Sequence, residues 1–207
     1  MANEYTTLSD FKTFIGRTIS TNPSDAVLTA HITNASRWVD SKCGRRFYAD
    51  TNATTRIYQP THYTLVQIDD AWDVTAVKTD EADDGTYSTT WSASDYQELP
   101  HNSIGQNGRT GWPTTAIEAT DTRWFPTRNA RPSVQVTAKW GWTAVPDEVV
   151  QATLYYAQRL MYLVDTPGGS TISSEFGSLP IRRLSDIESL LQPYMTGRAG
   201  DGRFLVA

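Results

Sequence analysis

The chain has 207 residues and a net charge of -5 at pH 7, with 39% hydrophobic and 20% charged residues. This length suits one domain, or a core domain with a sizeable insertion. The acidic balance argues against a sequence-independent nucleic-acid binder, which needs a basic surface. Cys43 is the only cysteine, which excludes a disulfide framework and fits a reducing cytosol. No apolar run approaches about 18 residues and the N-terminus lacks a signal-peptide pattern, so we expect a soluble protein with no membrane partner.

Two helices are predicted in the N-terminal part of the chain. The first is short, with Thr7 as a plausible N-cap and Gly16 at its end. The second is longer and runs from Ser24 or Asp25 to Gly44, where glycine is a natural C-terminal stop. Its apolar face recurs at steps of four, three and four residues and consists of Leu28, Ile32, Ala35 and Val39.

From about residue 47 the pattern changes from helix to strand. Short segments rich in Val, Ile, Thr, Tyr and Trp alternate with Gly, Pro, Asn and Asp, which predicts a small antiparallel sheet. The Asp84-Gly85 pair suits a hairpin turn, and the glycine-rich residues 101–113 are expected to form a mobile loop. The predicted strands are residues 54–60, 63–68, 73–79, 85–92, 95–99, 114–119 and 133–140.

Helix resumes at Asp147, with Pro146 beside its start. Residues 166–183 are rich in Gly, Ser and Pro and are expected to be a linker. Ser185 and Glu188 have capping-box spacing in a last short helix. The apolar face predicted for the longer of these two helices consists of Val150, Leu154, Ala157, Met161 and Val164.

These segments together predict an α+β protein. Two long and two short helices form a helical core from residues 1–46 and 146–195, and an antiparallel β-rich insertion occupies residues 47–145. An extended C-terminal tail covers residues 196–207.

The sequence offers little for catalysis or for a cofactor. His31, His62 and His101 lack the spacing that places two metal ligands on one helix face. Cys43 is expected to pack at a helix end rather than act as a nucleophile. A phosphate cradle at the glycines of residues 105–111 is rejected, because Trp-Pro follows them instead of a helix start. We therefore expect no metal, no cofactor and no enzymatic activity.

An acidic cluster near the predicted hairpin has three possible interpretations. A solvated turn is favoured, an acidic contact surface is the second reading, and a hydrolase using paired carboxylates is the third. Replacing Asp83 and Asp84 by Asn would abolish turnover only in the third case. The cluster consists of Asp69, Asp70, Asp73, Asp80, Glu81, Asp83 and Asp84.

The seven tryptophans and ten tyrosines exceed what a core of this size usually needs, so some are expected at contacts. Most of the tryptophans are interpreted as core or interface anchors, because a buried indole contributes a large apolar area and one donor. Alternatively they line a groove for a sugar or a peptide. The tryptophans concerned are Trp72, Trp91, Trp112, Trp124, Trp140 and Trp142.

Basic residues concentrate in segments other than the acidic cluster. Opposite charges on separate segments can pair between neighbouring copies of one chain, although a solvated surface is the commoner explanation for each single arginine. The arginines are Arg45, Arg46, Arg123, Arg128, Arg131, Arg182, Arg183, Arg198 and Arg203.

The order of segments carries more information than any motif. "ASRWVDSKCGRRFY" leads into the strand-rich insertion, and "VQVTAKWGWTAVPDEVVQATLYYAQRLM" leads into a Gly/Ser linker, a short helix and a basic-apolar tail. This order resembles the head-to-tail adaptor (connector) proteins of tailed bacteriophages. The resemblance implies a structural virion protein of the neck, made in the bacterial cytoplasm. It also implies a ring, usually of twelve copies, that sits beneath the portal protein, passes DNA through its lumen and receives the next neck or tail component.

A carbohydrate- or host-surface-binding component of the tail, using the tryptophan-rich insertion, is the alternative function.

The resemblance also supplies candidate contact residues. The candidates for portal contact are Arg198, Arg203, Phe204, Leu205 and Val206. The candidates for contact with a neighbouring subunit or the next component are Asp80, Glu81, Asp83, Asp84, Arg182 and Arg183.

Overall fold

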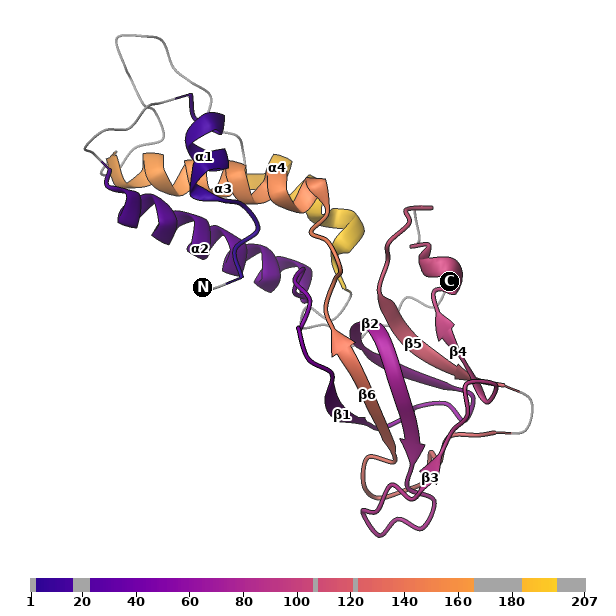
Figure 1. Cartoon of the computed structure of the whole chain (residues 1–207). Helices are drawn as coiled ribbons and strands as arrows, with labels where there is room; N and C mark the ends of the chain where they lie inside the picture. The colour runs from indigo at the N-terminus through magenta and orange to yellow at the C-terminus, as the bar shows by residue number, and fades with distance from the viewer. Residues whose placement is uncertain (1–2, 17–22, 106–107, 121–122, 166–183, 197–207) are drawn as a thin grey trace. The chain divides into compact units, whose positions relative to one another are not determined.

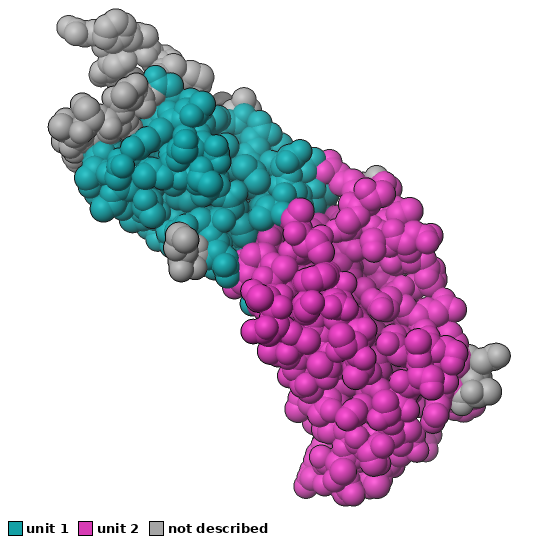
Figure 2. Space-filling view, in the orientation of Figure 1, with its two compact units in different colours: residues 1–46, 145–207 teal, residues 47–144 magenta. Residues whose placement is uncertain are grey.

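The computed structural model describes residues 3–16, 23–105, 108–120, 123–165 and 184–196. It divides into two compact units, one formed by residues 1–46 and 145–207 and the other by residues 47–144 (Figure 2). The first is helical and the second contains an antiparallel sheet of six strands (Figure 1). The α+β class predicted from the sequence is therefore confirmed.

The helical unit contains α1 (Leu8–Phe14), α2 (Asp25–Cys43), α3 (Asp147–Asp165) and α4 (Leu184–Leu191). Local signals set several of their ends. The Thr7 hydroxyl accepts a hydrogen bond from Asp10 N at 3.1 Å, as expected of an N-cap. Gly44 ends α2 in the left-handed conformation, with a φ of 65°.

Helices α2 and α3 lie side by side and antiparallel in Figure 1. The ring of Trp38 on α2 stacks on that of Tyr156 on α3, with centroids 4.0 Å apart. The predicted face of α3 is confirmed at Ala157 and Met161, which are buried, and at Leu154, which packs against the same core cluster. It is wrong in part, because Val150 is only partly buried while Thr153 is fully buried. The buried residues that α1, α2 and α3 contribute to their common core are Phe11, Leu28, Ile32, Ala35, Ala157 and Met161.

The C-terminal helix differs from its prediction at its start. Because α4 already begins at Leu184, Ser185 lies inside its first turn and the predicted capping box does not form. A 3-10 turn, η2 (Gln192–Tyr194), follows α4 and buries Tyr194, whose hydroxyl donates to the Glu148 carboxylate of α3 at 2.7 Å. Thr196 N then donates to Cys43 O at 2.8 Å. The described chain thus ends bonded to the end of α2.

The sheet of the second unit has the strand order β1-β6-β2-β5-β4, with β3 on β2. Its strands are β1 (Thr54–Tyr58), β2 (Leu65–Thr79), β3 (Thr89–Thr90), β4 (Tyr96–Leu99), β5 (Thr114–Ala119) and β6 (Val134–Trp140). A 3-10 turn, η1 (His101–Ser103), follows β4.

The two strands predicted at residues 63–68 and 73–79 are one strand, β2. Its first part pairs with β5, and its register with β6 shifts twice between Ala71 and Ala76. The acidic residues between the two predicted strands suggested a break, but each carboxylate has a partner in the fold. Asp69 accepts a hydrogen bond from the Arg56 guanidinium at 2.7 Å, and Asp70 accepts one from the Trp142 indole at 2.8 Å.

The core of this unit joins the sheet to the loops that cover it. Trp91 and Phe125 come from two of those loops and stack with centroids 4.5 Å apart. Trp140, at the end of β6, is fully buried and its indole donates to Thr54 O at 3.0 Å. The buried core residues of the strands are Val66, Ile68, Ala71, Val77, Ile117, Val134, Val136, Ala138 and Trp140.

Gly141 directly follows β6 and is required by close backbone packing. Its φ is 103°, and a Cβ atom at this position would lie 1.8 Å from the carbonyl oxygen of Tyr48. Its N–H donates to Asp70 O at 2.7 Å. The strand therefore ends where two backbone segments meet. Six residues, 141–146, separate its end from the start of α3 at Asp147.

Candidate functional site

The acidic turn, residues 80–85, connects β2 to β3 and is built around its own carboxylates. Asp80 is fully buried, and its carboxylate accepts hydrogen bonds from Gly85 N at 2.7 Å and Asp84 N at 3.4 Å. The carboxylate of Asp83 accepts hydrogen bonds from the N–H groups of Ala130 at 3.0 Å and Arg131 at 3.3 Å. A solvated turn is therefore wrong for Asp80, whereas Glu81, Asp83 and Asp84 are exposed.

Arg182 and Arg183, as well as the portal-contact candidates, lie outside the described residues. The latter are Arg198, Arg203, Phe204, Leu205 and Val206.

The residues considered above for chemistry are packed within the fold. Cys43 is buried at the end of α2, and burial raises the pKa of its thiol to about 12, so the thiol is protonated at neutral pH. Gly105 lies beneath Trp112, since an added Cβ atom would be 2.4 Å from the indole. In the part of the chain that the structure describes, no group of three or more His, Cys, Asp or Glu residues is arranged to hold a metal ion. No helix among the described residues is long and apolar enough to cross a membrane.

The tryptophans do not line one groove. Trp91, Trp140 and Trp142 are buried and act as core residues, as the favoured interpretation expected. Trp72 is 39% exposed and lies beneath the ammonium group of Lys139, which is 4.7 Å from the ring centroid. Trp124 is 66% exposed.

Trp124 and Tyr63 form an exposed aromatic pair, with ring centroids 5.6 Å apart and planes tilted by 55°. Tyr63 is 50% exposed and also stacks on His62 at 4.4 Å. Phe125 N donates to Tyr63 O at 2.7 Å and thereby holds the two loops together. Tyr63 was absent from the sequence-based candidates, because nothing local to "HYT" shows that Trp124 lies beside it.

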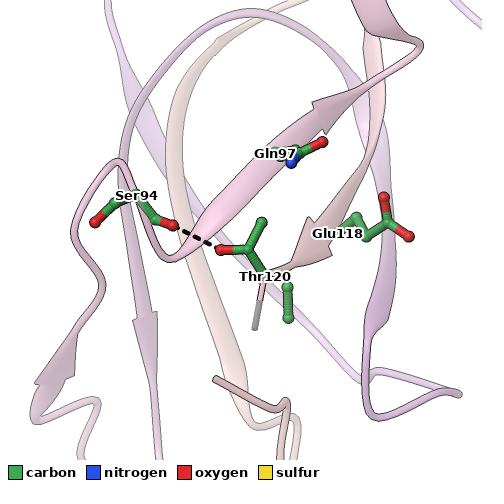
Figure 3. Close-up of a pocket in the computed structure, with 5 residues that line it drawn as sticks. Ser94, Gln97, Glu118 and Thr120 are labelled. Atoms are coloured by element: carbon green, nitrogen blue, oxygen red, sulfur yellow. Dashed lines mark hydrogen bonds between the residues drawn. The ribbon is translucent and has the colours of Figure 1, made fainter. Parts of the chain in front are cut away.

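A polar hollow lies at strands β4 and β5 (Figure 3). Gln97 on β4 and Glu118 on β5 are cross-strand partners and therefore share one face of the sheet. The Thr120 hydroxyl donates to Ser94 O at 2.6 Å. The lining residues are Ser94, Gln97, Glu118, Ala119 and Thr120.

Comparison with known proteins identifies similar folds. No protein-family model matches the sequence, and no curated protein matches it. Among solved structures, a chain described as "Neck of empty GTA particle computed with C6 symmetry" is 16% identical, with a TM-score of 0.53 and 96% of each chain covered. A chain from "Neck of native GTA particle computed with C12 symmetry" is 15% identical, with the same TM-score and coverage.

A third similar chain comes from the "Virion of native gene transfer agent (GTA) particle". It is 16% identical, with a TM-score of 0.51 and 95% of each chain covered. At these identities the likeness concerns the fold. At that level it agrees with the resemblance to head-to-tail adaptors that the order of segments predicted.

Proposed function

We propose that this chain is a structural component of the neck of a phage-like particle, where it acts as a head-to-tail adaptor. The observation that carries the proposal is the fold match to neck chains over 96% of this chain. Coverage this complete includes both the helical unit and the β-rich unit.

The proposed assembly is a ring of twelve identical copies beneath the portal protein. The similar neck structures were computed with C6 and C12 symmetry, which supports a cyclic arrangement. In such a ring each copy uses two different surfaces, one for each neighbour. Twelve copies at -5 each carry about -60 charges, and acidic groups on a lumen would let the DNA duplex pass without adhering.

The proposed portal contact is the C-terminal tail. Thr196 is held at the end of α2 by two hydrogen bonds to Cys43 O, from its N–H at 2.8 Å and from its hydroxyl at 2.9 Å. The tail therefore starts from a fixed point of the helical unit. Beyond that point the sequence supplies cationic and apolar side chains for the portal, namely Arg198, Arg203, Phe204, Leu205 and Val206.

The acidic turn is the proposed acceptor for a neighbouring subunit or for the next neck component. The hydrogen bonds of Asp80 and Asp83 hold the backbone of the turn, on which the side chains of Glu81 and Asp84 are exposed. Arg182 and Arg183 of a neighbouring copy would supply the opposite charge. A hydrolase using this turn has no support, because the carboxylates of Asp80, Asp83 and Asp84 already accept hydrogen bonds from backbone N–H groups.

The test is the solution mass of the chain alone and after mixing with the portal ring of the same particle. The full chain is expected to bind the portal as a layer of many copies, and deletion of residues 198–207 is expected to abolish this binding. An Arg128→Gln variant, which changes an exposed arginine of the β-rich unit, is the matched control and should bind as the full chain does. Failure of the full chain to associate with the portal would refute the adaptor function.

A further inference from the structure

The exposed aromatic pair and the adjoining polar hollow are not used in the proposed neck role. We propose that they form one binding site for a neutral saccharide. The pair would stack on the apolar C–H face of a sugar ring, and the hollow would bind its hydroxyl groups.

The aromatic pair has the exposure and rigidity that a stacking platform needs. Trp124 and Tyr63 are 66% and 50% exposed, although large aromatic side chains are usually well buried. The backbone that carries the two rings is held in place. Phe125, next to Trp124, is buried against Trp91, and its N–H donates to Tyr63 O. Less backbone entropy would therefore be lost when a ligand binds.

The tilt between the rings allows two kinds of contact with one ligand. Because Tyr63 is already stacked on His62, a sugar would lie flat on the more exposed Trp124 and meet the Tyr63 ring at an angle, since the two planes are tilted by 55°. The Tyr63 hydroxyl and the Trp124 indole N–H add polar groups to these apolar faces.

A backbone hydrogen bond connects the strand that lines the hollow to the segment that carries Tyr63. Ala119, which lines the hollow, donates its N–H to Thr64 O at 2.7 Å, and Thr64 follows Tyr63 directly. Gln97 offers an amide that both donates and accepts, and Glu118 offers a carboxylate that accepts (Figure 3). These groups match the hydroxyls of a saccharide, each of which can donate and accept.

The chemistry of the lining distinguishes a saccharide from a protein partner. The centre of a protein interface is typically apolar, whereas Ala119 is the only apolar residue that lines this hollow. A ligand with one apolar face and many hydroxyls fits both parts of the site.

The charged side chains near the hollow favour neutral over anionic saccharides. Glu118 would repel an anionic sugar, and the nearby cation, Arg123, is paired with Asp95 at 3.5 Å. Neutral hexose or N-acetylhexosamine chains are therefore the expected class.

The test is calorimetric titration of the full chain with maltohexaose, cellohexaose and chitohexaose, with polygalacturonate as the anionic comparison. At least one neutral chain is expected to bind saturably, and polygalacturonate is expected to bind more weakly. Trp124→Ala is expected to weaken binding about tenfold or more, while Trp124→Phe keeps part of it. Glu118→Gln should weaken the neutral ligand and reduce the discrimination against polygalacturonate.

Trp72→Ala is the matched control, because Trp72 is also an exposed tryptophan of the β-rich unit but does not line the hollow. It should leave binding unchanged. The absence of saturable binding by all three neutral chains at millimolar excess would overturn the proposal, as would equal loss in the Trp72 and Trp124 variants. The site lies within the β-rich unit, so portal binding by the adaptor assay can succeed or fail independently of this result. Loss of portal association in Trp124→Ala without any saccharide binding would assign the aromatic pair to a protein contact instead.

Discussion

Replacing Gly141 by Ala tests whether backbone packing at the end of β6 limits the stability of the β-rich unit. A Cβ atom at residue 141 would lie 1.8 Å from Tyr48 O and 2.8 Å from Tyr48 C. Both atoms belong to the backbone, so no side-chain rotation can relieve the overlap. The backbone near Tyr48, or the end of β6, must shift.

The magnitude follows from two contributions. A φ of 103° is unfavourable for alanine and costs about 1–3 kcal/mol. The forced shift would also weaken the hydrogen bonds from Gly141 N to Asp70 O and from Asp50 N to Trp140 O, both 2.7 Å long, at about 1 kcal/mol each. We expect the free energy of unfolding to fall by about 3–5 kcal/mol, a large part of the stability of a typical domain.

Gly111→Ala separates strain from overlap. The φ of Gly111 is 80°, but an added Cβ atom would meet nothing within 4 Å. This variant should therefore lose only about 1–2 kcal/mol. The assay is urea unfolding followed by tryptophan fluorescence, because the buried Trp140 and Trp142 lie on either side of Gly141. Equal losses in the two variants, or a loss below about 1 kcal/mol in Gly141→Ala, would refute the argument.

Three further predictions concern single side chains. Tyr194→Phe removes the hydrogen bond to Glu148 and should lower the free energy of unfolding of the helical unit by about 1 kcal/mol, measured by urea unfolding followed by circular dichroism; no loss would mean that water replaces the bond. Cys43 should react with a thiol reagent only on unfolding, because burial raises its pKa from 9.0 to about 12. Since the folded chain then binds the thiol proton more tightly, the contribution of Cys43 to stability is full below pH 9 and should be lost at up to about 1.4 kcal/mol per pH unit as the pH rises toward 12, a contribution that Cys43→Ala should remove. Asp83→Ala should cost about 1–2 kcal/mol in urea unfolding, because two backbone N–H groups lose their acceptor, whereas the neighbouring Glu81→Ala should change stability by less than about 0.5 kcal/mol; equal effects would show that the turn is not held by Asp83.

The parts of the fold that could be predicted depend on local chemistry. Thr7 caps α1 and Gly44 ends α2 because a hydroxyl acceptor and a left-handed glycine act within one helical turn. The β6-to-α3 seam follows from a change of apolar period around Gly141 and Pro146. Each of these signals requires only the residues that stand beside it in the chain.

Other parts depended on partners far along the chain. The break predicted in β2 is absent because Arg56 and Trp142 satisfy the two carboxylates at that point. Thr153 was left out of the predicted apolar face of α3, yet it is buried, because its hydroxyl donates to Val149 O at 2.8 Å. A polar residue can lie in a core or in a strand interior when its hydrogen bonds are satisfied. A rule based on the spacing of apolar residues does not predict such positions.

The sequence by itself determined the α+β class, the order of helical and strand-rich segments, and the resemblance to head-to-tail adaptors, because each depends on the succession of local patterns. Only the tertiary structure decided which polar groups are available for contact. It placed Asp80 beneath its turn, left Glu81 exposed, and brought Tyr63 beside Trp124. Burial and pairing are properties of the packed chain, since a side chain's exposure is set by residues that may stand anywhere else in the sequence.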